Sequence, residues 1–146
     1  MRLFNPDTII LHHSLTKDGP TVNWQAIRRY HVYDLGWTEI GYNYGIELIG
    51  TGYEILLGRF EGTIGAHTIG HNTHSIGICF IGNFDKDSPD MAQWNTGVEL
   101  CANIALRCHI SVENIKGHNH YAPYKTCPGK RFDVDLFRND VGALLI

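Results

Sequence analysis

The chain has 146 residues, a formal net charge of −3, a hydrophobic fraction of 43% and a charged fraction of 18%, values typical of one ordinary globular domain. The small negative charge argues against nucleic acid or an anionic membrane as the main partner. No apolar stretch at the N-terminus has signal-peptide length, and no run approaches transmembrane length. We therefore expect synthesis in the cytoplasm without a signal peptide, no membrane partner and, by default, a monomer.

The first half of the chain shows patterns of a buried strand, an amphipathic helix and a β-hairpin. These fall at residues 8–12, 22–33, 42–49 and 53–57. The helix carries Val22, Trp24, Ile27, Tyr30 and Tyr33 at helical spacing, and a glycine at position 36 suits its end. A Gly-Thr-Gly turn at 50–52 joins the hairpin strands, and residues 58–73 have the composition of a loop.

The second half predicts another buried strand, a long helix, the end of a short strand and a C-terminal helix. These fall at residues 75–82, 91–108, 115–118 and 134–145. The long helix has an apolar stripe at Trp94, Val98, Cys101, Ala105 and Cys108. Strands that alternate with helices indicate an α/β fold, and the hairpin excludes a wholly parallel sheet. We therefore expect a single domain with a central mixed β-sheet flanked by helices, with functional residues at strand ends on one side.

Three of the cysteines, Cys79, Cys101 and Cys108, are interpreted as buried free thiols. If one helix covers Cys101 and Cys108, they lie roughly 10 Å apart, which is too far for a disulfide. The cysteine spacing does not indicate a disulfide framework or an oxidising compartment.

The remaining cysteine stands in a histidine-rich segment that can complete a zinc site. His12 and His13 end the first strand, and their side chains should point to opposite faces of the sheet, so only one can reach a given site. Cys127 follows His118 and His120 in a segment restricted by two prolines, and either histidine could be the ligand. Two imidazoles and one thiolate leave the fourth tetrahedral position open for water, which is typical of catalytic zinc.

Five segments together resemble the zinc-dependent N-acetylmuramoyl-L-alanine amidases, which include phage lysozyme-type amidases and are related to the peptidoglycan recognition proteins. The matching segments occur in family order at residues 9–14, 40–44, 65–72, 75–84 and 118–129. They span nearly the whole chain, so the resemblance implies one amidase domain over residues 1–146. It also implies peptidoglycan as the substrate and Zn²⁺ as the cofactor.

The resemblance assigns a role to six residues. It implies zinc ligands at His12, His118 and Cys127, a catalytic tyrosine and lysine at Tyr42 and Lys125, and a histidine lining the substrate groove at His67.

Two features depart from the family pattern. The segment between His118 and Cys127 is one residue longer than usual, with Tyr124 as the insertion. Cys79 stands where wall-recycling amidases have a glutamate. This difference indicates that the chain is more similar to the phage amidases and recognition proteins.

The implied reaction is hydrolysis of the amide between N-acetylmuramic acid and L-alanine. Zinc would activate a water, Lys125 would stabilise the oxyanion, and Tyr42 would orient the water or assist proton transfer. The absence of a signal peptide fits an endolysin that reaches the cell wall after release. The alternatives are a non-catalytic peptidoglycan-binding module, which would lack the cysteine ligand, and a regulatory protein.

Overall fold

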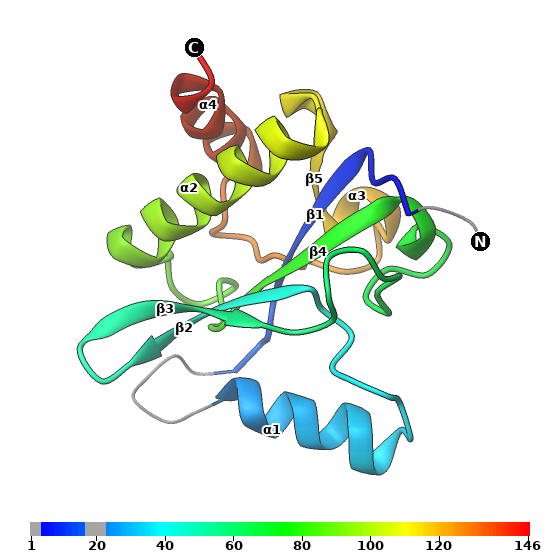
Figure 1. The fold of residues 1–146 in the computed structure, drawn as a ribbon. Coiled ribbons are helices and arrows are strands. Elements are labelled where there is room, and N and C mark those ends of the chain that lie inside the picture. The colour runs from blue at the N-terminus through cyan, green and yellow to red at the C-terminus, as the bar shows by residue number, and fades with distance from the viewer. Residues whose placement is uncertain (1–3, 17–22) are drawn as a thin grey trace.

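The computed structural model describes residues 4–16 and 23–146 and contains a five-stranded sheet of order β3-β2-β4-β1-β5 (Figure 1). The strands are β1 Thr8–His13, β2 Tyr44–Ile49, β3 Gly52–Leu57, β4 Ser75–Phe80 and β5 Ile115–Gly117. The pairs β1–β4, β1–β5 and β2–β4 are parallel, and the hairpin pair β2–β3 is antiparallel. The expected mixed sheet is thereby confirmed.

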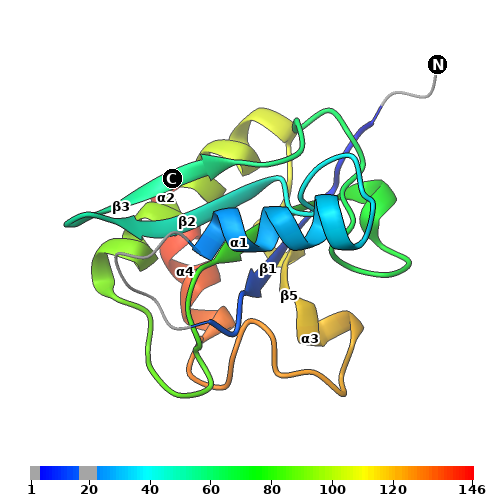
Figure 2. The same ribbon diagram turned by 90° about the horizontal axis from the view of Figure 1, so that it is seen from below.

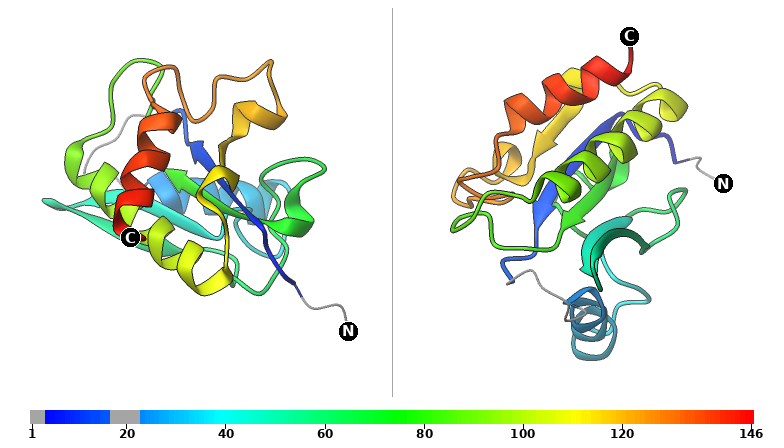
Figure 3. Two further views of the ribbon diagram at one scale, coloured as in Figure 1. Left: turned by 90° about the horizontal axis from the view of Figure 1, so that it is seen from above. Right: turned by 90° about the vertical axis from the view of Figure 1, so that its left-hand side faces the viewer.

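Helices cover both faces of this sheet, as Figures 2 and 3 show from three directions. The helices are α1 Asn23–Arg29, which continues as the π-helical turn Tyr30–Asp34, then α2 Met91–Cys108, α3 His118–Tyr121 and α4 Val134–Leu144. Helices α2 and α4 pack side by side on one face, and α1 crosses the other face near β2. The short α3 follows β5 at the end of the sheet.

The two central strands are buried over their full length. All six residues of β1 and all six of β4 are buried, which explains why apolar residues in them do not alternate with exposed polar ones. Ile9 and Leu11 belong to the large core beneath α2 and α4, whereas Cys79 and Ile81 belong to a smaller core with Trp24 on the α1 face. Each large apolar side chain buried here stabilises the fold by about 1.5–3 kcal/mol.

Helix α2 has the bounds predicted from its apolar stripe. The Asp90 carboxylate accepts a hydrogen bond from the Ala92 backbone N–H at 2.8 Å and caps the first turn. Trp94 is buried in the core and donates its indole N–H to Asp140 of α4 at 2.8 Å. The helix ends at His109, which has φ +55°, a left-handed conformation that terminates helices.

Two expectations about burial were wrong, each for a local reason. The N-terminal helix was expected from Val22, which lies outside the described residues, so its start stays a prediction. After Arg29 it widens into a π-turn, so Tyr30 and Tyr33 are 53% and 76% exposed rather than on the buried stripe. Cys108 is half-buried instead of buried, because it lies in the last turn of α2.

Three strands are shorter than expected. Strand β2 begins at Tyr44 rather than at residue 42, because Asn43 uses its side chain to accept from the Gly77 N–H at 2.9 Å. Strand β4 ends at Phe80 rather than at residue 82. Strand β5 ends at Gly117, and His118 begins a helical turn instead of ending the strand.

None of the helices in the described ranges is long and apolar enough to cross a membrane.

Glu61 links the loop after β3 to the end of α2. Arg107 donates from both terminal nitrogens to the Glu61 carboxylate at 2.9 and 3.1 Å, and the Tyr44 hydroxyl donates to the same group. The hydrogen bond from Arg107, followed by the one from Tyr44, lowers the pKa of Glu61 below its usual value despite partial burial. Burial and the same carboxylate raise the pKa of Tyr44 to about 12.

We expect Glu61→Gln to destabilise the protein by about 1.5–3 kcal/mol at pH 7, because hydrogen bonds to a charged group are lost. The folded-state pKa lies below the unfolded value, so this stabilisation is complete above the unfolded pKa and disappears as pH falls through the folded pKa. Urea unfolding at pH 7 and near pH 3 measures both effects. The exposed Glu54→Gln is the control, and an equal difference at both pH values would contradict the assignment.

Candidate active site

His12, His118 and Cys127 converge at one end of the sheet. Their ligand atoms all lie within 4.8 Å of one another, and each residue offers one imidazole nitrogen or the thiol sulfur. Cys127 Sγ is 3.7 Å from His12 Nδ1, and the rings of His12 and His118 have centroids 4.5 Å apart. Figure 1 shows why segments so distant in sequence meet, since β1 lies between β4 and β5.

Parallel pairing explains the meeting of the two histidines. In the register of β1 with β5, Leu11 is opposite Gly117, so the next residues, His12 and His118, emerge at the same end of adjacent strands. The Asn119 N–H then donates to the Cys127 carbonyl at 2.7 Å and holds the cysteine loop against α3. His120, the other histidine considered from the sequence, lies exposed on the same helical turn.

His12 and His13 point to opposite faces of β1. His12 is 1% exposed and faces the α1 side with the other two candidate ligands, whereas His13 stacks on Phe84 and accepts from the Phe84 N–H at 3.1 Å. His13 still contributes to the site through its backbone, because its N–H donates to Cys127 Sγ at 3.3 Å. An N–H directed at sulfur stabilises the thiolate form.

The two imidazoles are in the neutral form that binds metal, whereas the Cys127 thiol must first lose its proton. Burial lowers the pKa of His12 well below its usual value and, with help from the charge of Lys125, that of His118 to about 4, so both imidazoles are neutral at pH 7. Burial raises the pKa of Cys127 to about 12, although the His13 N–H and Lys125 oppose the rise. Two neutral nitrogens and one sulfur fit zinc, and binding would release the thiol proton.

The second nitrogen of His12 has partners that the sequence did not identify. His12 Nε2 lies 3.0 Å from His67 Nδ1 and 3.3 Å from the Thr68 hydroxyl, which leaves Nδ1 facing Cys127. Such outer hydrogen bonds set the tautomer and orientation of a metal-binding imidazole. Thr68 was missed because a threonine in a loop matches no sequence motif for a metal or catalytic site. Its position next to His67 was the one available signal.

His67 lies flat over the sheet because two glycines leave room for it. A Cβ on Gly77 would come within 2.5 Å of the His67 ring, and one on Gly65 within 2.7 Å. The Asn72 side chain accepts from the N–H groups of His67 and Thr68, both at 2.9 Å, and fixes the loop. His67 is thus packed against His12 rather than free in the groove, and burial lowers its pKa to about 3.

Tyr42 completes the wall of the site beside His12. The two rings meet edge to face with centroids 5.2 Å apart, and the fully buried Cys79 is on the same face of the sheet. Burial, and then the neighbouring Cys79 and Cys127, raise the pKa of Tyr42 well above its usual value. Tyr42 therefore keeps its hydroxyl proton at neutral pH and can donate a hydrogen bond.

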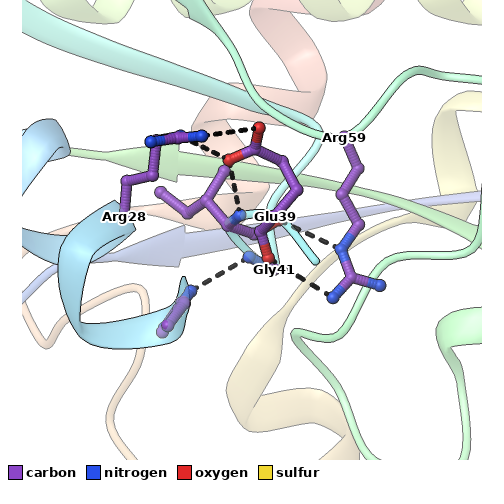
Figure 4. A network of polar contacts seen from close by, with 6 residues as sticks. Arg28, Glu39, Gly41 and Arg59 are labelled. Carbon is purple, nitrogen blue, oxygen red and sulfur yellow. Dashed lines mark hydrogen bonds and ion pairs between the residues drawn. The ribbon is translucent and has the colours of Figure 1, made fainter. Parts of the chain in front are cut away.

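A polar network fixes the backbone immediately before Tyr42 (Figure 4). Arg28 of α1 donates to Glu39 at 2.6 Å, and Arg59 donates to the Ile40 carbonyl at 3.1 Å. The Gly41 N–H donates to His31 Nδ1 at 3.0 Å. These contacts connect α1, the segment before β2 and the loop after β3, so they hold Tyr42 on the α1 face.

The three candidate ligands, Tyr42 and His67 line a cavity of about 530 Å³. Lys125 and Tyr124 are exposed at its edge, with Lys125 Nζ 6.0 Å from the Tyr124 ring centroid. His31 and Asp85 also line the cavity and were not singled out from the sequence. All six residues that the sequence assigned to the site therefore face this one cavity: His12, Tyr42, His67, His118, Lys125 and Cys127.

Comparison with known proteins identifies the family. The family model described as N-acetylmuramoyl-L-alanine amidase matches residues 3–130, and the chain belongs to this family. The endolysin of Escherichia phage T7 is 33% identical over 133 residues, which cover 88% of this chain and 82% of the endolysin.

Solved structures show the same fold. The N-acetylmuramoyl-L-alanine amidase LysC from Clostridium intestinale URNW superposes with a TM-score of 0.81 at 28% identity, covering 97% of this chain and 91% of LysC. Peptidoglycan recognition protein-LE, solved in complex with tracheal cytotoxin, has a TM-score of 0.76 at 27% identity, covering 93% and 82% of the two chains. The resemblance in the sequence is thereby confirmed, and the relatives include both enzymes and recognition proteins.

We expect Gly77→Ala to destabilise the protein by about 1–3 kcal/mol, because the new methyl group would displace the His67 ring. Urea unfolding measures the change. Gly52→Ala is the matched control, since a Cβ there meets nothing within 4 Å and should change stability by less than about 0.5 kcal/mol. Equal, small changes in the free energy of unfolding of both variants would show that the packing of His67 over Gly77 does not contribute to stability.

Proposed function

We propose that residues 1–146 act as one zinc-dependent amidase domain that hydrolyses the bond between N-acetylmuramic acid and L-alanine in peptidoglycan. The main support is the convergence of His12, His118 and Cys127 in a cavity that also contains Tyr42, within a member of the amidase family. One similar protein is named an endolysin and another, LysC, an N-acetylmuramoyl-L-alanine amidase, which favours the bacterial cell wall as the place of action. The expected form is a monomer.

His12, His118 and Cys127 would hold the metal, and the contacts of His12 with His67 and Thr68 would keep its ring oriented. Zinc, when bound, would supply a Lewis acid that activates water at neutral pH. His12 is buried whereas Lys125 is exposed at the edge of the cavity, so the scissile amide would enter from the edge that carries Lys125.

Lys125 and Tyr42 would act on the substrate in different ways. The ammonium group of Lys125 is two residues from Cys127, and its charge already acts on His12, His118 and Cys127. Such a charge would stabilise the oxyanion that develops on the carbonyl oxygen. Tyr42 keeps its proton, so it would donate a hydrogen bond to the water or the substrate rather than serve as a base.

The second candidate is a peptidoglycan-binding module without catalysis. It is favoured by the similarity to recognition protein-LE, whose structure contains monomeric diaminopimelic acid-type peptidoglycan. The presence of Cys127 beside both histidines favours the enzyme, because a pure binding module does not need a thiol ligand.

We expect about one tightly bound zinc per chain in the purified protein, and lysis of purified cell walls that a chelator abolishes and added zinc restores. Elemental analysis and the turbidity of a wall suspension measure the two quantities. Zinc without lysis would favour the binding module. A protein with neither zinc nor lysis would refute both the metal site and the enzyme.

We expect Cys127→Ser and His118→Ala to lose zinc and to reduce lysis to background, because each removes one ligand. The exposed His120→Ala is the matched control and should keep both. Circular dichroism checks that the variants remain folded. Full lytic activity in Cys127→Ser would contradict the ligand assignment.

We expect Lys125→Ala to lower kcat by about 10²–10³-fold while zinc content is unchanged, because one stabilising charge on the oxyanion is lost. Lys130→Ala removes an exposed lysine nearby in sequence and serves as the control. Steady-state kinetics on a soluble muropeptide separate kcat from KM. An effect on KM alone would assign Lys125 to substrate binding instead.

A further inference from the structure

A second pair of imidazoles faces each other outside the active-site cavity. His71 Nδ1 lies 3.0 Å from His74 Nε2, and the two residues stand three apart at the 3₁₀-helical turn Asn72–His74. Both side chains are half-buried, and their rings meet at 75° with centroids 5.2 Å apart. Neither residue lines the cavity that contains His12.

Asp7 determines which nitrogen of His74 carries a proton. The Asp7 carboxylate lies 2.7 Å from His74 Nδ1 and accepts a second hydrogen bond, from the Thr8 hydroxyl, also at 2.7 Å. The Thr8 hydrogen bond lowers the pKa of Asp7, so the carboxylate is ionised and can only accept. His74 Nδ1 must therefore donate, and in the neutral ring the lone pair of Nε2 points toward His71.

This arrangement matches the surroundings of a metal-binding histidine. A carboxylate on one ring nitrogen fixes the tautomer and makes the other nitrogen a better ligand. The His71 ring is held in place against Tyr121, with centroids 3.9 Å apart. Its backbone is fixed at both ends, since its N–H donates to the Thr68 carbonyl at 3.0 Å and its carbonyl accepts from the Ser75 hydroxyl at 2.7 Å.

The separation of the two nitrogens is also suitable. Two imidazole nitrogens at about 2.05 Å from one ion, with an angle of about 90–109° between them, lie about 2.9–3.4 Å apart. The observed 3.0 Å falls within this range, so one ion can lie at bonding distance from both nitrogens.

We propose that His71 and His74 form a second divalent-cation site, supported by Asp7, that takes an imidazole-preferring ion such as Zn²⁺, Ni²⁺ or Cu²⁺. Water fills the remaining positions. The site is distinct from the proposed zinc site at Cys127.

A cation bound by His71 and His74 would stabilise the loop between β3 and β4, which contacts the active site. The same loop carries His67 and Thr68, whose side chains contact His12 and whose N–H groups donate to Asn72. An ion held by His71 and His74 would brace this loop on both sides of Asn72. The occupied site therefore stabilises the fold around His12 without contributing a ligand to it.

The test is a calorimetric titration of ZnCl₂ into protein already loaded at its tightest site. We expect one further binding event, which is lost in His71→Ala and in His74→Ala and weakened about 10-fold or more in Asp7→Ala. The matched control is His109→Asn, which removes an exposed histidine and tolerates the left-handed backbone there. At 100 times its dissociation constant, zinc should raise Tm by about 5–10 °C in the wild type but not in His74→Ala.

The same titration in the Cys127→Ser variant separates this site from the proposed zinc centre, because the event lost in His74→Ala should persist there. Retention of wild-type Tm and circular dichroism by His71→Ala and His74→Ala without added zinc excludes unfolding as the cause of any loss. No further binding event in the wild type, or an event that remains in His74→Ala, would overturn the proposal.

Discussion

The candidate site depends on the parallel pairing of β1 with its two neighbours. β1 is completely buried between β4 and β5. Leu11 of β1 is opposite Ile78 of β4 and Gly117 of β5, so the residues that come next on these strands lie at the same end of the sheet. Burial of these strands stabilises the domain and also fixes the relative positions of His12 and His118. A shift of one residue in β1 would turn His12 into the core under α2 and bring His13 to the site.

Burial has opposite effects on the two kinds of donor atom in the site. It keeps the imidazoles of His12 and His118 neutral, which favours metal binding, and it keeps the Cys127 thiol protonated, which opposes binding. The His13 N–H and the charge of Lys125 act against the second effect. Metal affinity should therefore depend on how well the small loop from α3 to Cys127 maintains these two contacts.

The loop between β3 and β4 contributes residues both to the candidate active site and to the His71–His74 pair outside it. It packs His67 over Gly77 and presents Thr68 to His12. It then turns so that His74 contacts both His71 and Asp7, which precedes β1. Asn72 accepts hydrogen bonds from the N–H groups of His67 and Thr68, so the turn that contains Asn72 and His74 also holds the backbone at His67. The loop thus links two clusters of histidines that share no ligand.

The sequence by itself determined the α/β class, helix α2, the hairpin and the group of residues that face the cavity. The first three follow from local physics: an unbroken apolar run, an apolar stripe at helical spacing and a glycine turn. The site residues follow from the resemblance of five sequence segments to a known family. Strand parity left both His118 and His120 open, and the family resemblance chose His118. The tertiary structure brings His118 beside His12 and Cys127, because it begins a helical turn after β5 rather than continuing the strand. It also identified Thr68 as a partner of His12, and Asp7 as a partner of His74 from 67 residues away. Such pairings depend on strand register and loop packing, and neighbouring residues in the sequence do not encode them.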